Sequence, residues 1–267
     1  MSIDLYTLLP MVKASITAIT SEETGYPKEN MMDWNPDTHW RPSSTSNQTI
    51  DIDLGSAQQV DQFAVWIHNY NTDYDFGTHG IQLYSDDNDD GNYTAITAMI
   101  SELWDPTVGT PIYFPAASPT PTTKRYWRLA IVNCGSNIAQ ISGIFLLRKR
   151  TLTAAANLPL RDTGQFFNRT MRAAGGRRFV AGLNSGEGGT LPRTFVLSQT
   201  DWEALEDAHQ DCRGSLRPFI YTEDSVNYYV RFTEDLDKLD QNMIHYQLYQ
   251  PTITLEKIPY IQDGETT

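Results

Sequence analysis

The sequence is short of cysteine and of long apolar runs, and each shortage excludes a class of protein. Cys134 and Cys212 are too few for a disulfide framework, and neither lies in a spacing typical of zinc sites. No stretch approaches the roughly 20 apolar residues that a membrane helix needs. The first residues lack both the basic start and the apolar run of a secretory signal. We therefore expect free thiols, no membrane insertion and assembly in the cytoplasm.

Basic residues are also scarce: the 267 residues include 20 Lys and Arg against 33 Asp and Glu, for a formal net charge of −13. Nucleic-acid binding through a broad surface needs clustered Lys and Arg, so we expect no nucleic-acid partner. The hydrophobic fraction of 40% is sufficient for packed cores. At roughly 100–200 residues per domain, this length predicts two domains.

Catalytic signatures are absent as well. The five histidines show no HExxH spacing, and there is no GxSxG elbow around a serine. Pairs of Asp and Glu arise by chance on an acidic surface, so they do not indicate a glycosidase. The sequence predicts a binding or structural protein, with no catalytic residues.

The first 150 residues carry the pattern of a mainly β domain. Residues 49–54 alternate strictly, which turns Ile50, Ile52 and Leu54 inward and Asp51 and Asp53 outward. Further short strands are expected at 63–67, 80–84, 126–132 and 141–147, separated by stretches rich in Gly, Pro, Asn and Asp. This organisation predicts a β-sandwich or jelly roll over residues 1–150.

The composition changes after residue 150, so we expect a linker at 151–165 and a second domain at 166–267. Thr200 and Glu203 form a capping-box pattern that predicts the start of a helix. Trp202, Leu205, Ala208 and Cys212 make one apolar stripe on that helix, and Gly214 is the expected C-terminal cap. Strands are expected at 194–197, 218–221, 228–232 and within 245–256. One helix among such strands predicts an α+β domain with an antiparallel sheet.

Several segments of the first half carry a family resemblance when taken in order. They are Tyr26–Trp40, Ile52-Asp-Leu-Gly55, Val60–Val65, Ile81–Asp87, Arg125-Tyr-Trp-Arg-Leu129 and Gln140–Ile144. Over about residues 14–148, this set resembles the discoidin-type, galactose-binding-like β-sandwich. The resemblance implies a domain that binds glycans, lipids or proteins through loops at one end.

The same resemblance implies a calcium site, because many relatives hold a structural calcium ion in the loop that here contains Asp33, Asp37 and Thr38. Calcium takes six to eight oxygen ligands, so two carboxylates alone would bind it weakly. This sequence also has Gly143 where relatives often have a glutamate. A loop held by its own Asp and Asn hydrogen bonds is the alternative. The turn Asp86–Gly91 begins like a calcium loop but has Thr97 at the twelfth position, so we expect an ordinary hairpin turn there.

Sugar binding needs aromatic surface together with a few converging polar groups. The loop from residue 68 to 79 offers that mixture after a strand. The candidate glycan-binding residues are Trp34, His39, His68, Tyr70, Tyr74 and His79. The alternative is that these histidines only bond to their neighbours and that Trp40 is a core residue.

The second half resembles a different group. The segments Arg193–Ser198, Asp201–Leu205, Arg213–Ile220, Tyr228–Asp235 and Gln250–Glu256 occur in order. Over about residues 170–260 they resemble distal-tail and tail-tube proteins of tailed phages. The resemblance implies a structural virion component at the tail tip or baseplate, whose partners are tail-tube, hub and fibre proteins and, through the sandwich, a host glycan. A free-standing carbohydrate-binding adhesin or lectin module is the alternative.

Charge supports assembly of the second domain into a ring. Residues 161–193 carry six Arg against one Asp and one Glu, whereas residues 194–267 carry five basic and fourteen acidic side chains. Such stretches supply complementary faces for a homo-oligomer, or they simply mix on a solvated surface. The candidate interface residues are Phe179, Tyr228, Tyr229, Tyr246 and Tyr249.

Overall fold

A computed structural model describes the chain as two compact units. The N-terminal unit comprises Leu8–Pro106 and Pro111–Lys149, and the C-terminal unit comprises Met1–Thr7, Thr107–Thr110 and Arg150–Thr267. The predicted domain boundaries at 150 and 165 stay a prediction, because residues 154–162 lie outside the described part of the chain. The described residues are 3–33, 35, 37–68, 80–88, 90–96, 104–108, 112–115, 119–132, 138–153, 163–165, 168–172, 178–182, 188–233, 236, 243–245, 248–249 and 251–258.

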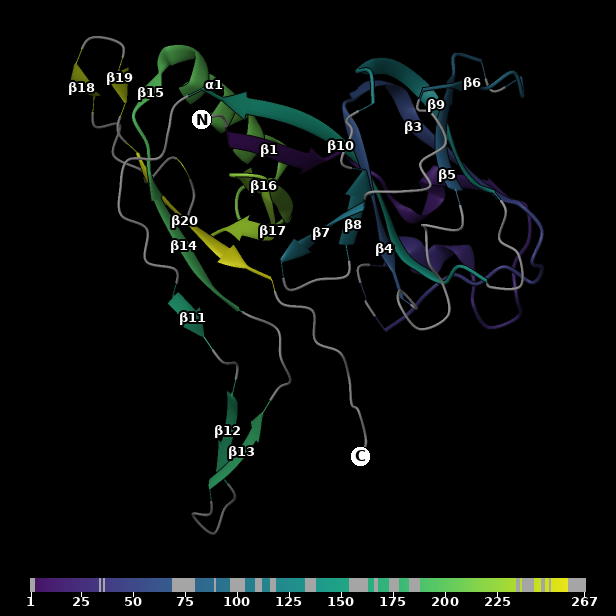
Figure 1. Ribbon diagram of the computed structural model, residues 1–267, viewed down its shortest axis with the longest axis horizontal. Helices are drawn as coiled ribbons and strands as arrows, with labels where there is room; N and C mark the ends of the chain where they lie inside the picture. Colours follow the sequence, from purple (N-terminus) through teal and green to yellow (C-terminus); the bar gives the residue numbers. More distant parts are fainter. Residues whose placement is uncertain are drawn as a thin grey trace. The chain divides into compact units, whose positions relative to one another are not determined.

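The N-terminal unit contains two sheets (Figure 1). One has the strand order β2 (Ile16–Ile19), β3 (Gln48–Val60), β9 (Thr122–Val132), β5 (Gly80–Asp86) and β6 (Thr94–Ala95). In the other, β10 (Ile141–Leu152) pairs with β4 (Gln62–Ile67), which pairs with β8 (Ile112–Pro115), next to β7 (Trp104–Val108). Two short 3-10 helices, η1 (Lys13–Ser15) and η2 (Lys28–Met32), lie between the early strands.

The two sheets share one apolar core, as the alternation of the strands predicted. Ile50 and Ile52 are fully buried, and they share the core with Leu129 of β9 and Leu146 of β10. Trp40 is also in this core, with none of its surface exposed. The sandwich predicted for this part of the chain is therefore confirmed.

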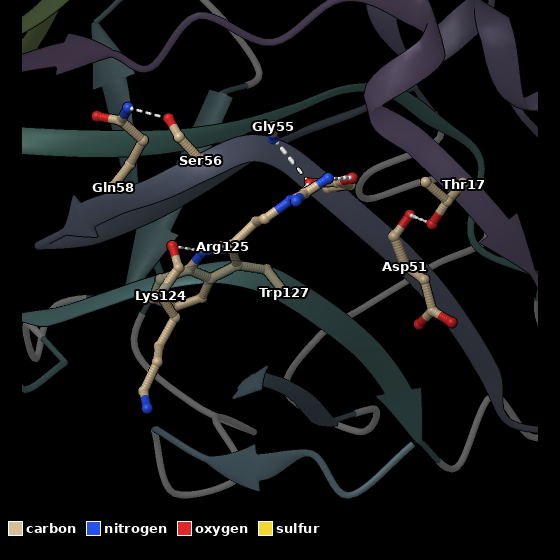
Figure 2. A network of polar contacts seen from close by, with 9 residues as sticks. Thr17, Asp51, Gly55, Ser56, Gln58, Lys124, Arg125 and Trp127 are labelled. Carbon is tan, nitrogen blue, oxygen red and sulfur yellow. Dashed lines mark hydrogen bonds and ion pairs between the residues drawn. The ribbon is translucent and has the colours of Figure 1, made fainter. Parts of the chain in front are cut away.

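The outward side chains of β3 pair with β9 across the sheet. The guanidinium of Arg125 donates from Nε and Nη2 to the two carboxylate oxygens of Asp53 at 2.7 and 2.8 Å. Arg128 binds Asp51 in the same way at 2.6 and 2.8 Å. Gly55, with a φ of +77°, donates its N–H to Asp53 at 2.7 Å (Figure 2). These contacts fix the register of the strands beside the bulge that follows Asp53.

The C-terminal unit is built on a sheet that includes the first strand of the chain. Its strand order is β11 (Thr163–Gln165), β14 (Gly188–Thr194), β20 (Thr252–Lys257), β17 (Val226–Phe232), β16 (Phe219–Glu223) and β1 (Ile3–Leu8). β1 pairs antiparallel with β16 (Figure 1). Two small sheets complete the unit: β12 (Asn168–Arg172) with β13 (Arg178–Gly182), and β15 (Leu197–Ser198), β19 (Leu248–Tyr249) and β18 (Met243–His245).

The predicted helix is present as α1 (Gln199–Asp211), but the predicted cap is wrong by two residues. Ser198 is the N-cap, and its hydroxyl accepts from the backbone N–H of Asp201 at 3.2 Å. Thr153 favours Ser198 over Thr200 as the N-cap residue, because its N–H and hydroxyl both donate to the Asp201 carboxylate, at 3.0 and 2.8 Å. Thr200 is exposed and takes no part in the cap.

The rest of the helix prediction is confirmed. Leu205, Ala208 and Cys212 are fully buried, and Trp202 is 4% exposed. Gly214 has a φ of +67°, and its N–H donates to a carbonyl in the last turn of the helix at 2.9 Å.

A buried ion pair lies within the C-terminal unit. Arg193 of β14 and Glu223 of β16 are 3% and 7% exposed, and Nε and Nη2 of the arginine lie 2.9 and 2.8 Å from Oε2 of the glutamate. One of the six arginines in the basic stretch is therefore used inside the unit instead of on its surface.

The predicted fold class is confirmed: the chain is mainly β, with a sandwich and a second α+β unit that contains one α-helix in the described residues. In that part of the chain, no helix has the length and apolar character needed to cross a membrane.

Candidate ligand-binding site

Two loop segments of the N-terminal unit are brought together by the start of β10. Trp40 exchanges two backbone hydrogen bonds with Ile141, at 2.9 and 3.0 Å. His68 follows the last residue of β4, and its N–H donates to the carbonyl of Gln140 at 2.8 Å. Because Gln140 and Ile141 are neighbours, these bonds place His39 and His68 side by side.

The side chains of Tyr26, His39 and His68 form a stack of three rings, which we call the ring stack. The centroids of Tyr26 and His39 are 4.7 Å apart with an interplanar angle of 27°. Those of His39 and His68 are 4.2 Å apart at 23°. All three residues are half-buried. Because stacking on two neighbours covers the faces of the His39 ring, a ligand would meet the ring stack at the ring edges.

One cation and one anion lie beside the ring stack. The guanidinium carbon of Arg41 is 5.9 Å from the centroid of the Tyr26 ring. Its Nε is 2.9 Å from a carboxylate oxygen of Glu23, and the two side chains are 35% and 38% exposed. The site therefore offers a donor group and an acceptor group that already balance each other in charge.

His39 is held in its neutral form at pH 7. Burial, together with the nearby His68 and Arg41, lowers the pKa of His39 from 6.5 to about 4. Its Nδ1 atom is buried and has no hydrogen-bond partner. The backbone beneath it is fixed, because the side chain of Asn30 donates to the His39 carbonyl at 2.9 Å.

Hydrogen bonds within the loop hold the segment for which the resemblance implied calcium. Asp33 accepts from the N–H of Asn35 at 2.9 Å and from the hydroxyl of Thr38 at 2.7 Å, so both carboxylate oxygens are used. The exposed Asp37 donates its N–H to the side chain of Asn35 at 3.1 Å. At Gly143, a Cβ would lie 2.9 Å from the ring of Phe145. These hydrogen bonds are those of the alternative reading, and the calcium site at Asp33, Asp37 and Thr38 stays a prediction.

The second calcium-like segment is a hairpin turn between β5 and β6. The Asp86 carboxylate accepts from the backbone N–H groups of Asp87 and Asp90 at 2.6 and 3.2 Å. Gly91 completes the turn with a φ of +87°. In the residues that the structure describes, no three His, Cys, Asp and Glu side chains are grouped to hold a metal.

Of the predicted glycan-binding residues, the structure brings His39 and His68 together. Trp34, Tyr70, Tyr74 and His79 lie outside the described residues. Tyr26, Arg41 and Glu23 were not among the predicted residues. Tyr26 is the first residue of the Tyr26–Trp40 segment, and this position was the one sequence feature that indicated a place near the site.

The predicted interface residues have different surroundings. Tyr228 is half-buried, with Nζ of Lys257 at 5.3 Å from the centroid of its ring. Tyr229 is 5% exposed and packs inside the unit. Tyr249 stacks on Trp202 with centroids 5.3 Å apart. Tyr246 and the side chain of Phe179 lie outside the described part of the chain.

The family of the N-terminal unit follows from its sequence, since residues 15–144 match the F5/8 type C domain. This part of the chain is an F5/8 type C domain. The matched residues are nearly those of the discoidin-type resemblance, at about residues 14–148, and they include the ring stack. No curated protein matches the chain.

Solved structures similar to the chain include carbohydrate-binding modules. A family 32 CBM of C. perfringens NanJ in complex with galactose has a TM-score of 0.42 and 17% identity over 54% of this chain and 99% of that chain. Chitosan-binding module 1 of a chitosanase/glucanase from Paenibacillus sp. IK-5 has a TM-score of 0.38 and 19% identity over 52% and 99%. A Ruminococcus gnavus GH29 fucosidase in complex with fucose has a TM-score of 0.38 and 21% identity over 49% of this chain and 24% of that chain.

Proposed function

We propose that the F5/8 type C domain is a carbohydrate-binding module, not an enzyme, and that its ligand binds at the ring stack. The observation that carries the proposal is the meeting of Tyr26, His39 and His68 beside the Arg41–Glu23 pair. Half-buried rings next to a few polar groups are the usual lining of a sugar site.

The ring stack would recognise hydroxyl groups mainly through hydrogen bonds. The neutral His39 imidazole has one ring nitrogen that donates and one that accepts, and because Nδ1 is buried, a ligand hydroxyl would meet Nε2. Arg41 supplies further donors, and Glu23 supplies acceptors. Such a set fits a ligand with several adjacent hydroxyl groups better than a purely apolar or an anionic one.

The test is binding of the full-length protein to a glycan array at pH 7.5, followed by calorimetry with the strongest ligand. We expect His39→Ala and Tyr26→Ala each to weaken binding about five- to tenfold, because a lost hydrogen bond or ring contact is worth roughly 1–1.5 kcal/mol. His209→Ala is the matched control, since His209 lies in the C-terminal unit. Equal affinities for wild type and the His39 and Tyr26 variants would contradict the proposed site.

We also infer a second, broader role for the whole chain, as a structural component of a tailed-phage virion that displays this module. What supports it is the C-terminal unit, in which helix α1 accompanies an antiparallel sheet, as in the tail proteins that residues 170–260 resemble. The chain would then be assembled in the host cytoplasm, reside in the tail, and contact tail-tube, hub and fibre proteins.

Assembly of the full-length chain tests this broader role. Rings or tubes in negative-stain micrographs, with a matching mass in light scattering, are the expected result. Tyr228→Glu should reduce that assembly if the half-buried ring lies in a subunit contact, whereas Val12→Glu, a change at an exposed residue of the N-terminal unit, should not. A monomer at high concentration would favour a free-standing lectin module instead.

A further inference from the structure

We propose that the N-terminal unit has a second binding site, a polar pocket at the end of β5 that takes a small ligand carrying a primary ammonium group. The pocket has a volume of about 160 Å³ and is lined by residues of β5, of the turn after it, of the β6 segment and of the start of β9. Sites for drug-sized molecules measure roughly 300–1,000 Å³, so this one suits a smaller ligand. The inference goes beyond the proposed function, because the pocket contains no residue of the ring stack.

The pocket and the ring stack lie at opposite ends of the sandwich. Val60, at the end of β3, pairs with Thr122, which lines the pocket. Asp61 alone separates β3 from β4, so β4 starts at the pocket end and runs to the other end, where His68 follows it. The six residues of β4 rise about 3.3 Å each, which places the two sites on the order of 20 Å apart. Binding at one site can therefore be measured without occupying the other.

A buried hydroxyl group faces the pocket. Ser85 continues the inward positions of β5 after Ile81 and Leu83, and it is 2% exposed. Ser85 lines the pocket, and its hydroxyl has no hydrogen-bond partner in the part of the chain that the structure describes. Thr94 pairs directly opposite on β6, so its side chain is on the same face of the sheet. Because burying a hydroxyl without a partner is unfavourable, a ligand that supplies the partner recovers free energy.

The charges at the pocket favour a cation. The carboxylates of Asp86 and Asp87 line it together with the ammonium group of Lys124. Lys124 forms an ion pair with Asp87. Asp86 accepts from backbone N–H groups of its own turn, but among the described residues it has no cationic side chain as a partner. One negative charge is therefore left over at the pocket, and the net charge of −13 of the chain adds to the attraction for cations.

The other lining groups suit an ammonium ion better than a metal ion. An ammonium group has three donors and no acceptor, which matches the hydroxyl oxygens of Ser85 and Thr94 and a carboxylate of the turn. The Thr122 hydroxyl donates to the carbonyl of Thr120 at 3.0 Å, so its oxygen is also left to accept. Ile96 packs against the core and offers apolar surface to the carbon atoms beside the ammonium group. A metal ion would need more carboxylates, and the described residues contain no group of three His, Cys, Asp and Glu side chains that could hold one.

The test is a titration of full-length protein, labelled with ¹³C at the methyl groups of Ile and Thr, with propylammonium chloride. We expect the NMR signals of the Ile96, Thr94 and Thr122 methyl groups to shift and to saturate. Propanol has nearly the same shape without the charge, so it is the matched ligand control and should cause no saturable shift. Glucosamine and putrescine are then titrated in the same way. Tighter binding of either one supports the inference and distinguishes an amino sugar from a polyamine as the source of the ammonium group.

Two substitutions should change the affinity for propylammonium in opposite directions. Ser85→Ala removes the buried hydroxyl and should weaken binding about fivefold. Lys124→Gln removes the cation that competes for Asp87, so it should strengthen binding about two- to fivefold. An anionic ligand would instead lose affinity in this variant. Ser43→Ala, at an exposed residue outside the pocket, is the matched control for Ser85→Ala and should leave the affinity unchanged.

The outcomes separate this inference from the proposed function. Equal responses to propylammonium and propanol overturn it, as does an unchanged affinity in Ser85→Ala or a weaker one in Lys124→Gln, provided that circular dichroism shows each variant to be folded. Displacement of propylammonium by an equal concentration of calcium would reveal a metal site and would overturn it as well. His39→Ala should bind propylammonium as wild type does, so a failure of glycan binding at the ring stack leaves this result unaffected.

Discussion

Replacing Asp201 should destabilise helix α1 far more than its position on a helix suggests. The Asp201 carboxylate is 5% exposed and accepts from the N–H and the hydroxyl of Thr153 and from the hydroxyl of Ser198, at 3.0, 2.8 and 2.9 Å. Asp201→Ala leaves the Thr153 N–H without its acceptor. It also removes the carboxylate that accepts from the hydroxyl of the N-cap residue Ser198. A hydrogen bond to a charged group is worth about 1.5–3 kcal/mol and an N-cap about 1 kcal/mol, so we expect a loss of about 3 kcal/mol.

Hydrogen exchange measured by mass spectrometry on peptides that cover residues 199–212 is the appropriate assay, because it reports the helix separately from the sandwich. A loss of about 3 kcal/mol corresponds to roughly 100-fold faster exchange. The matched control is Asp207→Ala on the same helix. Asp207 is 54% exposed and pairs with Arg150 at 2.7 Å, so its loss should cost less than about 1 kcal/mol.

The effect should also depend on pH. Burial alone would raise the pKa of Asp201, but the hydrogen bonds from Thr153 and Ser198 outweigh it and hold the pKa below its usual 3.8. The carboxylate therefore contributes stability above about pH 4, and this contribution is lost as the pH falls through the lowered pKa. The difference between wild type and Asp201→Ala should shrink in that range. Equal exchange in Asp201→Ala and Asp207→Ala at pH 7 would refute the reasoning.

Three further substitutions test other parts of the structure. Leu205→Ala should cost about 2–5 kcal/mol in urea unfolding because Leu205 is fully buried, whereas Leu216→Ala, at a residue that is 77% exposed, should change stability by less than about 0.5 kcal/mol. Asp33→Ala should lower the melting temperature, while a chelator should leave wild type unchanged; a chelator-induced drop would show that calcium binds. Arg193→Met alone should cost about 3–5 kcal/mol, because it leaves the Glu223 carboxylate buried and unpaired, and combining it with Glu223→Leu should recover most of the loss.

Local patterns were sufficient to predict most elements of the fold. The alternation around Ile50 and Ile52 defined β3 because the side-chain period of a strand is visible in the sequence itself. The helix cap was different, since Ser198–Asp201 and Thr200–Glu203 both have the spacing of a capping box. The choice between them depends on Thr153, whose contact with Asp201 spans 48 positions and leaves no local signal.

In the site, too, some features could be predicted from local sequence and others depend on contacts between distant residues. His39 and His68 could be predicted as candidates from the sequence, because both lie in segments expected to be loops and both carry side chains suited to sugar binding. Their stacking depends on bonds to Gln140 and Ile141, about 70 to 100 positions further along the chain, which periodicity does not reveal. Tyr26 and Arg41 were missed for the same reason, since their relation to the histidines exists only after the loop has folded.

The place of β1 in the C-terminal sheet has a consequence for the order of folding during synthesis. Asp4–Thr7 pair with Phe219–Thr222, so β1 leaves the ribosome well before β16, the strand with which it pairs. At about 5–20 residues per second, the delay is on the order of 10–40 s. During that time the sandwich can form, while β1 is not yet paired with β16. A C-terminal fragment without residues 3–8 would lack a strand of its own sheet, so a version that folds alone needs that segment joined to it.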